Sequence, residues 1–126
     1  MGAPDPLREI PFRPSRMIHF FDPSNPKMAA KVPELAAKCD VVLGNLEDAI
    51  ASDKKIAARE GLVAIGEATD FGDTQLWVRI NSLDSPWVLD DLTRLVPAIG
   101  HKLDVVMVPK VEAASDIHYV DRLLAQ

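Results

Sequence analysis

Four short apolar runs recur along the chain, and each is followed by a polar turn and then by a segment with helical spacing. The runs occupy residues 17–21, 41–46, 76–80 and 105–108. Runs rich in Val, Ile and Leu are typical of strands buried on both faces of a parallel sheet, and strands that alternate with helices indicate β/α units. The pattern therefore predicts an α/β fold of four β/α units, with neighbouring strands parallel and joined by right-handed crossovers.

Small polar residues and prolines predict where the first two helices begin. Asn25, directly before a proline, is the expected cap of the first helix, and Pro33 is expected to split that helix into two short pieces. A second helix is expected from a cap at Ser52 or Asp53 to about Glu67. Its expected apolar stripe consists of Ile56, Ala57, Val63 and Ala64.

Two further helices follow the third and fourth runs. Ser85 and Pro86 repeat the cap-and-proline signature, and Gly100 is the matching end of the third helix. Ser115 is the expected cap of the fourth helix. The buried faces are expected to contain Val88, Leu92, Leu95 and Ile99 in the third helix and Ile117, Val120 and Leu124 in the fourth.

The length of 126 residues corresponds to one domain. A complete (β/α)8 TIM barrel needs about 250 residues, so the chain is expected to cover the first four β/α units of such a barrel. A half barrel leaves two open edges, which favour association with another chain or copy. A small open doubly wound sheet is the alternative that needs no second half. The proline-rich residues 1–15 are expected to form an extended lead-in, and residues 16–126 the barrel domain.

Charge, cysteine content and the length of the apolar runs limit the expected partners and cellular compartment. The chain has 14 Lys and Arg against 19 Asp and Glu, a net charge of −5, so nucleic acid is not an expected partner. It contains one cysteine, Cys39, which is expected to be a small core residue in a protein of a reducing compartment. The chain shows neither an apolar signal segment nor a run of about 20 apolar residues, so a soluble, cytoplasmic protein without membrane partners is expected.

Candidate catalytic groups are expected where the strands end, because the carboxyl ends of parallel strands meet at one rim. Arg79 lies inside an apolar run, where its charge either forms a structural ion pair with Glu47 or Asp48, or binds a substrate carboxylate or carbonyl. Glu47 and Asp48 are neighbours, so only one is expected to face the barrel axis. By spacing alone they could equally be an acidic pair at a helix N-terminus. Lys110 is either a Schiff-base or anion-binding lysine or a solvated surface group.

The histidines and tryptophans do not form a recognisable site in the sequence. His19, His101 and His118 lack the spacing of metal ligands and are interpreted as structural residues. Trp77 and Trp87 are interpreted as packing residues.

Four motifs in register resemble those of the HpcH/HpaI aldolase and citrate lyase β-subunit family, and among its branches they are most similar to malyl-CoA lyase. They are Arg16–Phe21 followed by Pro23–Met28, Leu46–Ile50 followed by Lys54 or Lys55 and Ala58-Arg59, Val78–Asn81, and Pro109–Glu112. The resemblance implies a (β/α)8 barrel and a carbon-carbon lyase that uses Mg2+ and a CoA thioester. It implies retro-aldol cleavage or condensation of a dicarboxylic acyl-CoA, such as malyl-CoA, to acetyl-CoA and glyoxylate. The alternatives are a citrate lyase β-like protein that acts on citryl thioesters, and a non-catalytic half barrel that only associates with another chain.

The resemblance also assigns roles to residues at the rim. It implies that Arg79 contacts the substrate, and that Glu47 and Asp48 support that arginine and the waters of the metal site. Asn45 stands where many members of the family carry Asp. The residues that it assigns to binding of substrate or CoA, besides Arg79, are Phe20, Ser24, Asn25, Lys27, Asn81 and Lys110. The family's acidic Mg2+ ligands come from later strands, beyond Gln126, so the 126-residue chain alone is expected to be inactive. The complete enzyme is expected to be a homo-oligomer.

Overall fold

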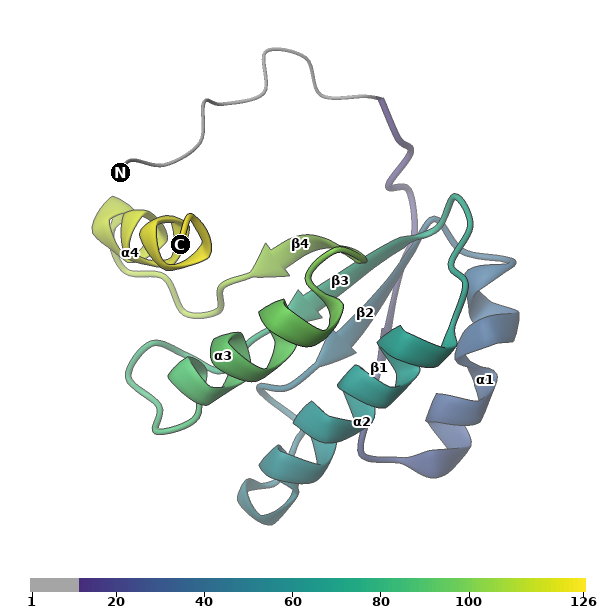
Figure 1. Ribbon diagram of the computed structural model, residues 1–126, viewed down its shortest axis with the longest axis horizontal. Helices are drawn as coiled ribbons and strands as arrows, with labels where there is room; N and C mark the ends of the chain where they lie inside the picture. Colours follow the sequence, from purple (N-terminus) through teal and green to yellow (C-terminus); the bar gives the residue numbers. More distant parts are fainter. Residues whose placement is uncertain (1–11) are drawn as a thin grey trace.

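The computed structural model describes residues 12–126, which form a four-stranded sheet with helices packed against it (Figure 1). The strands lie close to the predicted runs and are β1 (Ile18–Phe21), β2 (Val41–Asn45), β3 (Gln75–Arg79) and β4 (Leu103–Met107). The helices are α1 (Pro26–Ala36), α2 (Lys55–Ala68), α3 (Val88–Ile99) and α4 (Ala114–Leu124), with a short 3-10 turn, η1 (Ser52–Lys54), before α2. The predicted alternation of strands and helices is confirmed.

All three strand pairings are parallel, and the strand order in the sheet is β1-β2-β3-β4. Helices α1, α2 and α3 lie along one face of this sheet, and α4 follows beyond its β4 edge (Figure 1). A sequential order with helices on one face is the arrangement of a β/α barrel. A doubly wound sheet reverses its strand order at a switch point, and this sheet does not reverse, so that alternative is wrong.

The strand register separates a helix-facing side of the sheet from a barrel-facing side. Phe21, Val42, Leu76 and Val78 belong to the main hydrophobic core with the helices. Successive side chains on a strand point to opposite faces. The other face therefore carries one row through Phe20, Leu43, Trp77 and Val105, and a second row through Asn45, Arg79 and Met107. Arg79 thus points toward the side that a closed barrel would enclose.

Helix α1 is continuous through Pro33, so the predicted split into two pieces is wrong. Pro33 is exposed on the outer side of the helix, while its neighbour Val32 is buried against the core. Packing of this buried face outweighs the cost of one missing backbone hydrogen bond on the solvent side. The predicted cap is confirmed, because the Asn25 side chain accepts a hydrogen bond from the backbone nitrogen of Lys27.

The predicted buried stripe of α2 is largely wrong. Ile56 is 66% exposed, and Ala57 and Ala64 are also exposed, so only Val63 of the four is buried. The buried face is rotated and consists of Lys55, Ala58, Arg59, Leu62, Val63, Ile65 and Gly66. The prediction missed this face because a buried stripe is normally assigned from apolar residues alone, and two of the buried residues, Lys55 and Arg59, are charged.

The last two helices differ in how well they are packed. In α3 the four predicted core residues are buried and Gly100 follows the last helical residue, although the helix begins at Val88 and not at Pro86. Helix α4 begins at Ala114, and the Asp116 carboxylate accepts from the backbone nitrogens of Glu112 and Ala113. Of its predicted buried face, Val120 is buried but Ile117 and Leu124 are exposed. The core prediction therefore holds for α3 and only in part for α4.

The segment before β1 crosses the amino-terminal ends of the strands. Arg13 forms an ion pair with Asp104 on β4 at 2.7 Å, and Arg16 forms one with Asp40, directly before β2, at 3.0 Å. The Arg16 side chain holds the pKa of the Asp40 carboxyl below its usual range by its hydrogen bond and its charge. Residues 1–11 of the predicted lead-in lie outside the described residues.

Candidate functional site at the carboxyl ends of the strands

Side chains from the ends of β2, β3 and β4 meet in one cluster. The Glu47 carboxylate lies between two cations, with Oε1 3.6 Å from Arg79 Nε and Oε2 2.8 Å from Lys110 Nζ. Lys110 Nζ is also 3.3 Å from Asp48 Oδ1. The predicted convergence of these strand ends at one rim is therefore confirmed. We call Glu47, Asp48, Arg79 and Lys110 the rim cluster.

The Nε atom of Arg79 is hydrogen-bonded within the protein, whereas its two Nη atoms face the open rim. Its Nε donates to Asn45 Oδ1 at 3.0 Å, and the guanidinium lies over the Phe20 ring, 5.2 Å from the ring centroid. Among residues 12–126, neither Nη atom of Arg79 has a hydrogen-bond partner. The side chain is 23% exposed. Two adjacent Nη donors at an open rim form the planar fork that binds a carboxylate in a bidentate manner.

Asn45 organises the turn that carries Glu47. Its Oδ1 accepts from Arg79 Nε and from the backbone nitrogen of Glu47, at 3.0 and 3.1 Å, and its amide nitrogen donates to the Asp48 carbonyl. An amide both accepts and donates, whereas an ionised carboxylate at the same place would only accept. Asn45 therefore couples the position of Arg79 to the backbone of the turn.

Glu47 and Asp48 differ in burial, although both carboxylates contact Lys110 Nζ. Glu47 is 5% exposed, whereas the Asp48 side chain is 69% exposed. The side-chain hydrogen bond with Glu47, followed by the hydrogen bond and charge of Lys110, lowers the pKa of Asp48. The hydrogen bonds from Lys110 to Glu47 and Asp48, together with the charges of these two carboxyl groups, raise the pKa of Lys110. Lys110 is thus a charged partner of the acidic pair, and these contacts contain no neutral amine of the kind a Schiff base requires.

Two backbone positions at this rim adopt left-handed conformations. Within residues 12–126, the non-glycine residues with positive φ are Ala49, with φ of 73°, and Lys110, with φ of 52°. Such conformations cost free energy for residues with a Cβ and persist where the surrounding contacts fix them. Both lie in the turns after β2 and β4 that carry the rim cluster, which supports a functional interpretation of these turns.

The other predicted binding residues are less directly connected to the rim cluster. Ser24 donates from Oγ to Asp22 Oδ1 at 2.6 Å, Asn25 caps α1, and Lys27 is exposed at the start of that helix. Asn81 is buried, and its side-chain nitrogen donates to Asp91 Oδ2 at 2.7 Å. Phe20 and Lys110 therefore join Arg79 at the rim, whereas Asn81 supports the strand end from within the core.

Three buried charged residues behind the rim were not assigned a role from the sequence. Lys55 Nζ donates to the carbonyls of Leu46 and Glu47, each at 2.8 Å. Arg59 Nε donates to Asp91 Oδ1 at 3.0 Å, and Asp91 is 0% exposed. Asp91 lies within the apolar spacing of α3, but the spacing of Lys55 and Arg59, four residues apart on α2, does not distinguish a buried pair from a solvated one.

The described residues do not provide a complete magnesium site. Mg2+ requires near-octahedral oxygen ligands, and no group of three His, Cys, Asp or Glu suited to a metal occurs within residues 12–126. The Glu47 carboxylate is already engaged by Arg79 and Lys110. The residues present therefore fit the binding of a substrate anion better than the binding of a metal. None of the helices in this part of the chain is long and apolar enough to cross a membrane.

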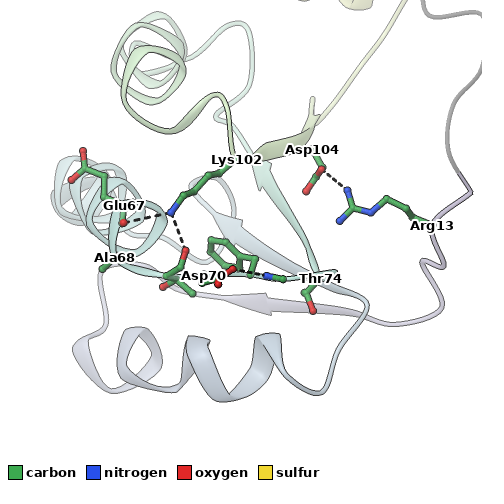
Figure 2. A pocket seen from close by; sticks show the side chains of 10 residues that line it. Arg13, Glu67, Ala68, Asp70, Thr74, Lys102 and Asp104 are labelled. Atoms are coloured by element: carbon green, nitrogen blue, oxygen red, sulfur yellow. Dashed lines mark hydrogen bonds and ion pairs between the residues drawn. The ribbon is translucent and has the colours of Figure 1, made fainter.

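A hollow lies away from the rim, at the opposite end of the sheet. It has a volume of about 540 Å³ and lies between the Arg13–Asp104 pair and Lys102 (Figure 2). Lys102 Nζ donates to the carbonyls of Gly66 and Thr69 at 2.7 and 3.0 Å. The cations at this hollow are thus already paired with protein groups. Active sites of β/α barrels lie at the carboxyl ends of the strands, so size alone does not identify the site here.

Comparison with known proteins gives consistent matches over nearly the whole chain. The family model described as HpcH/HpaI aldolase/citrate lyase matches residues 16–126. A malyl-CoA/β-methylmalyl-CoA/citramalyl-CoA lyase from Chloroflexus aurantiacus is 58% identical over 125 residues, which are 99% of this chain and 36% of the relative. An L-malyl-CoA/β-methylmalyl-CoA lyase from Cereibacter sphaeroides is 39% identical over 90% of this chain and 35% of the relative. The chain thus spans about a third of the length of these curated relatives.

A solved structure shows the same fold. The protein CitE from Mycobacterium tuberculosis, crystallised with magnesium, acetoacetate and coenzyme A, matches with a TM-score of 0.60 and 26% identity. The match covers 82% of this chain and 35% of the CitE chain.

Proposed function

Because the chain belongs to the HpcH/HpaI aldolase/citrate lyase family, we propose that it forms part of the active site of a carbon-carbon lyase. The proposed reaction is magnesium-dependent retro-aldol cleavage of a dicarboxylic acyl-CoA such as malyl-CoA, which yields acetyl-CoA and glyoxylate. The 58% identity to the Chloroflexus aurantiacus lyase over nearly the whole chain supports this choice among related reactions.

One observation carries the proposal. Arg79 is fixed through Nε by Asn45 and presents its Nη groups at the carboxyl ends of the strands, with no partner for them among residues 12–126. A guanidinium held in this way is pre-organised, so little side-chain entropy is lost when a carboxylate binds. The carboxylate of malyl-CoA becomes the carboxylate of glyoxylate, so the same contact is kept from substrate to product.

The rim cluster would orient the bond that breaks. Cleavage of malyl-CoA breaks the bond between the hydroxyl-bearing carbon and the CH2 group next to the thioester. The hydroxyl loses its proton and becomes the aldehyde oxygen of glyoxylate. The electron pair of the broken bond passes to the thioester enolate, which then takes up a proton to give acetyl-CoA. Arg79 would hold the carboxylate end, while Lys110 and Glu47 keep the arginine and the turn in place. Groups fixed before the reaction lower the barrier because they need no reorganisation.

The remaining roles in substrate binding are proposed from the resemblance and not from contacts. Phe20 lies at the rim beneath Arg79, so it is suited to contact the acyl group. Ser24, Asn25 and Lys27 lie in and directly after the β1–α1 turn, which we assign to CoA. Asn81 is proposed to act on substrate only through its support of the β3 end. We assign the magnesium ligands to residues outside 12–126, because the described residues do not complete a site.

A chimera tests this function in a complete enzyme. The matching 125 residues of the Chloroflexus aurantiacus lyase are replaced by this chain, and release of acetyl-CoA and glyoxylate from malyl-CoA is followed with Mg2+ present. The proposal predicts turnover with both products in equal amounts. A chimera that folds as its parent does, yet releases neither product, would contradict it. Faster cleavage of citryl-CoA than of malyl-CoA would favour the citrate lyase β-like alternative.

A further inference from the structure

Lys55 is buried directly behind the rim cluster and makes its contacts with backbone groups. Its Nζ donates to the carbonyls of Leu46 and Glu47, the two residues that follow β2, and each distance is 2.8 Å. The same atom lies 5.3 Å from the centroid of the Trp87 ring, which covers it from the start of α3. The ammonium is therefore held between the turn that carries Glu47 and an aromatic face.

This placement is costly, so it needs a compensating role. Burial is the main cause that lowers the pKa of Lys55, and the charges of Glu47, Asp91 and Asp48 oppose that effect. An apolar residue of similar length would fill the space without the desolvation cost of an ammonium. What an apolar residue cannot do is hold two carbonyls at one point.

We propose that Lys55 is a positioning residue for the rim cluster: its Nζ fixes the Leu46 and Glu47 carbonyls, and through them the Glu47 carboxylate and Arg79. This positioning role deepens the proposed function, and its expected effect on catalysis rests on that function. The Glu47 backbone nitrogen and Arg79 Nε share Asn45 Oδ1 as acceptor, so a shift of the turn must change both hydrogen bonds. The contact path therefore runs from α2 through the backbone of the turn to the substrate-facing guanidinium.

The chain contains a matched control for this proposal. Lys102 Nζ also donates to backbone carbonyls, those of Gly66 and Thr69, but at the opposite end of the sheet. Replacement of either lysine by methionine removes a charge and the hydrogen bonds of an ammonium while it keeps an unbranched side chain. A loss that comes only from weaker folding would follow both variants. A loss of positioning at the rim would follow Lys55→Met alone.

The direct measurement is the Nε–H signal of Arg79 in 15N-labelled protein, recorded for the 126-residue chain and its variants without any ligand. The proposal predicts that Lys55→Met shifts or broadens this signal, whereas Lys102→Met leaves it at the wild-type position. An unchanged signal in folded Lys55→Met would overturn the proposal. Equal changes in both variants would also overturn it, because they would show a general effect of instability.

Lys55→Arg keeps the measurement decisive if Lys55→Met does not fold. A guanidinium keeps the charge, but it is longer, planar and bulkier than the compact ammonium that lies between the two carbonyls and the Trp87 ring. We expect it to displace the carbonyls, and the Arg79 signal to move with them. A signal at the wild-type position in Lys55→Arg would contradict the proposed path.

A second readout separates the positioning role from the proposed function. In the chimera with the Chloroflexus aurantiacus lyase, Lys55→Met is expected to lower kcat/KM for malyl-CoA by about 10- to 100-fold, the range expected when a reacting group is displaced by about 1 Å. Lys102→Met is expected to stay within about twofold of the unmodified chimera. If the unmodified chimera does not cleave malyl-CoA, the proposed function fails, and the positioning role is decided by the Arg79 signal alone. If the chimera is active and Lys55→Met matches it, the positioning role fails and the function stands.

Discussion

Replacement of Asp91 by asparagine should strongly destabilise the fold, because this carboxylate is the common acceptor of a buried network. Asp91 is 0% exposed, and its Oδ1 accepts from Arg59 Nε at 3.0 Å. Its Oδ2 accepts from the backbone nitrogen of Asn81 at 3.0 Å and from the Asn81 side chain at 2.7 Å. These contacts join α2, α3 and the end of β3.

Asparagine has nearly the shape of aspartate but cannot satisfy these donors. If its NH2 group takes the place of Oδ1, it faces Arg59 Nε–H, and if it takes the place of Oδ2, it faces two N–H groups of Asn81. Either orientation sets donor against donor. The variant also leaves the buried Arg59 charge without its carboxylate, a loss that costs about 3–5 kcal/mol in proteins. That is a large share of the roughly 5–15 kcal/mol by which a domain is stable.

A second pair between the same two helices provides the control. Arg94 on α3 and Glu60 on α2 form an ion pair at 2.9 Å, and both side chains are about half exposed. An exposed pair contributes about 0–1 kcal/mol, so Glu60→Gln should have little effect. Both variants remove one negative charge from α2 or α3 and differ chiefly in the burial of the pair.

Urea unfolding followed by circular dichroism, at one protein concentration, measures both effects. With a slope of about 2 kcal/mol per M, Asp91→Asn should lower the urea midpoint by about 2 M, and Glu60→Gln by less than about 0.5 M. If Asp91→Asn were within about 1 kcal/mol of Glu60→Gln, the buried network would not stabilise the β3 end as argued. A double variant, Arg59→Met with Asp91→Asn, should recover part of the loss, because the buried charge is then removed and the asparagine oxygen can face both N–H groups of Asn81.

Three further predictions concern pH, packing and association. Since burial places the pKa of Lys55 below its unfolded value of 10.5, the unfolded chain binds more protons between these two values, and the stability of the wild type relative to Lys55→Met should rise with pH in that window. Urea midpoints of both proteins between pH 7 and about 10.5 test this. The titration of Lys110, whose pKa is raised, is common to both proteins and cancels in the comparison. A midpoint difference between wild type and Lys55→Met that falls with rising pH would contradict the prediction. Gly61→Ala should lower the melting temperature although alanine favours helices, because a Cβ there would lie 2.1 Å from the Pro23 carbonyl oxygen, and a raised melting temperature would show that this contact yields easily. The 126-residue chain alone should release no acetyl-CoA from malyl-CoA with Mg2+ and should associate in solution through its exposed edges; a monodisperse 13.8 kDa species that turns over substrate, by light scattering and product assay, would refute both statements.

The strand order and the rim could be predicted from the sequence because both follow from local patterns. Each apolar run was long enough to identify a strand, and the polar residues directly after the runs identified the carboxyl ends. Parallel pairing then placed Glu47, Arg79 and Lys110 together without knowledge of any distance. The structural interpretation of Arg79, an ion pair with Glu47, and the substrate-binding interpretation proved compatible, since Nε makes the internal contact and the Nη groups stay open.

The buried polar layer behind the rim could not be predicted in the same way. Lys55, Arg59 and Asp91 are charged, and the expected buried faces are assigned from apolar residues alone, which places the stripe of α2 at Ile56 instead of Lys55 and Arg59. Their burial depends on partners far along the chain, which periodicity does not reveal. Continuity of α1 through Pro33 was missed for a related reason, because the packing of Val32 outweighs a local penalty.

The most direct test of the central claim, that Arg79 binds the substrate carboxylate through its open Nη groups, is the value of kcat/KM for malyl-CoA in the chimera with Arg79→Lys. Lysine keeps the charge but loses the bidentate fork, so kcat/KM should fall by about 10-fold or more, which corresponds to ~1.4 kcal/mol. Arg94→Lys, the same exchange on the outer surface of α3, should leave it unchanged. Wild-type kinetics in a correctly folded Arg79→Lys chimera, or an equal loss in Arg94→Lys, would contradict the claim.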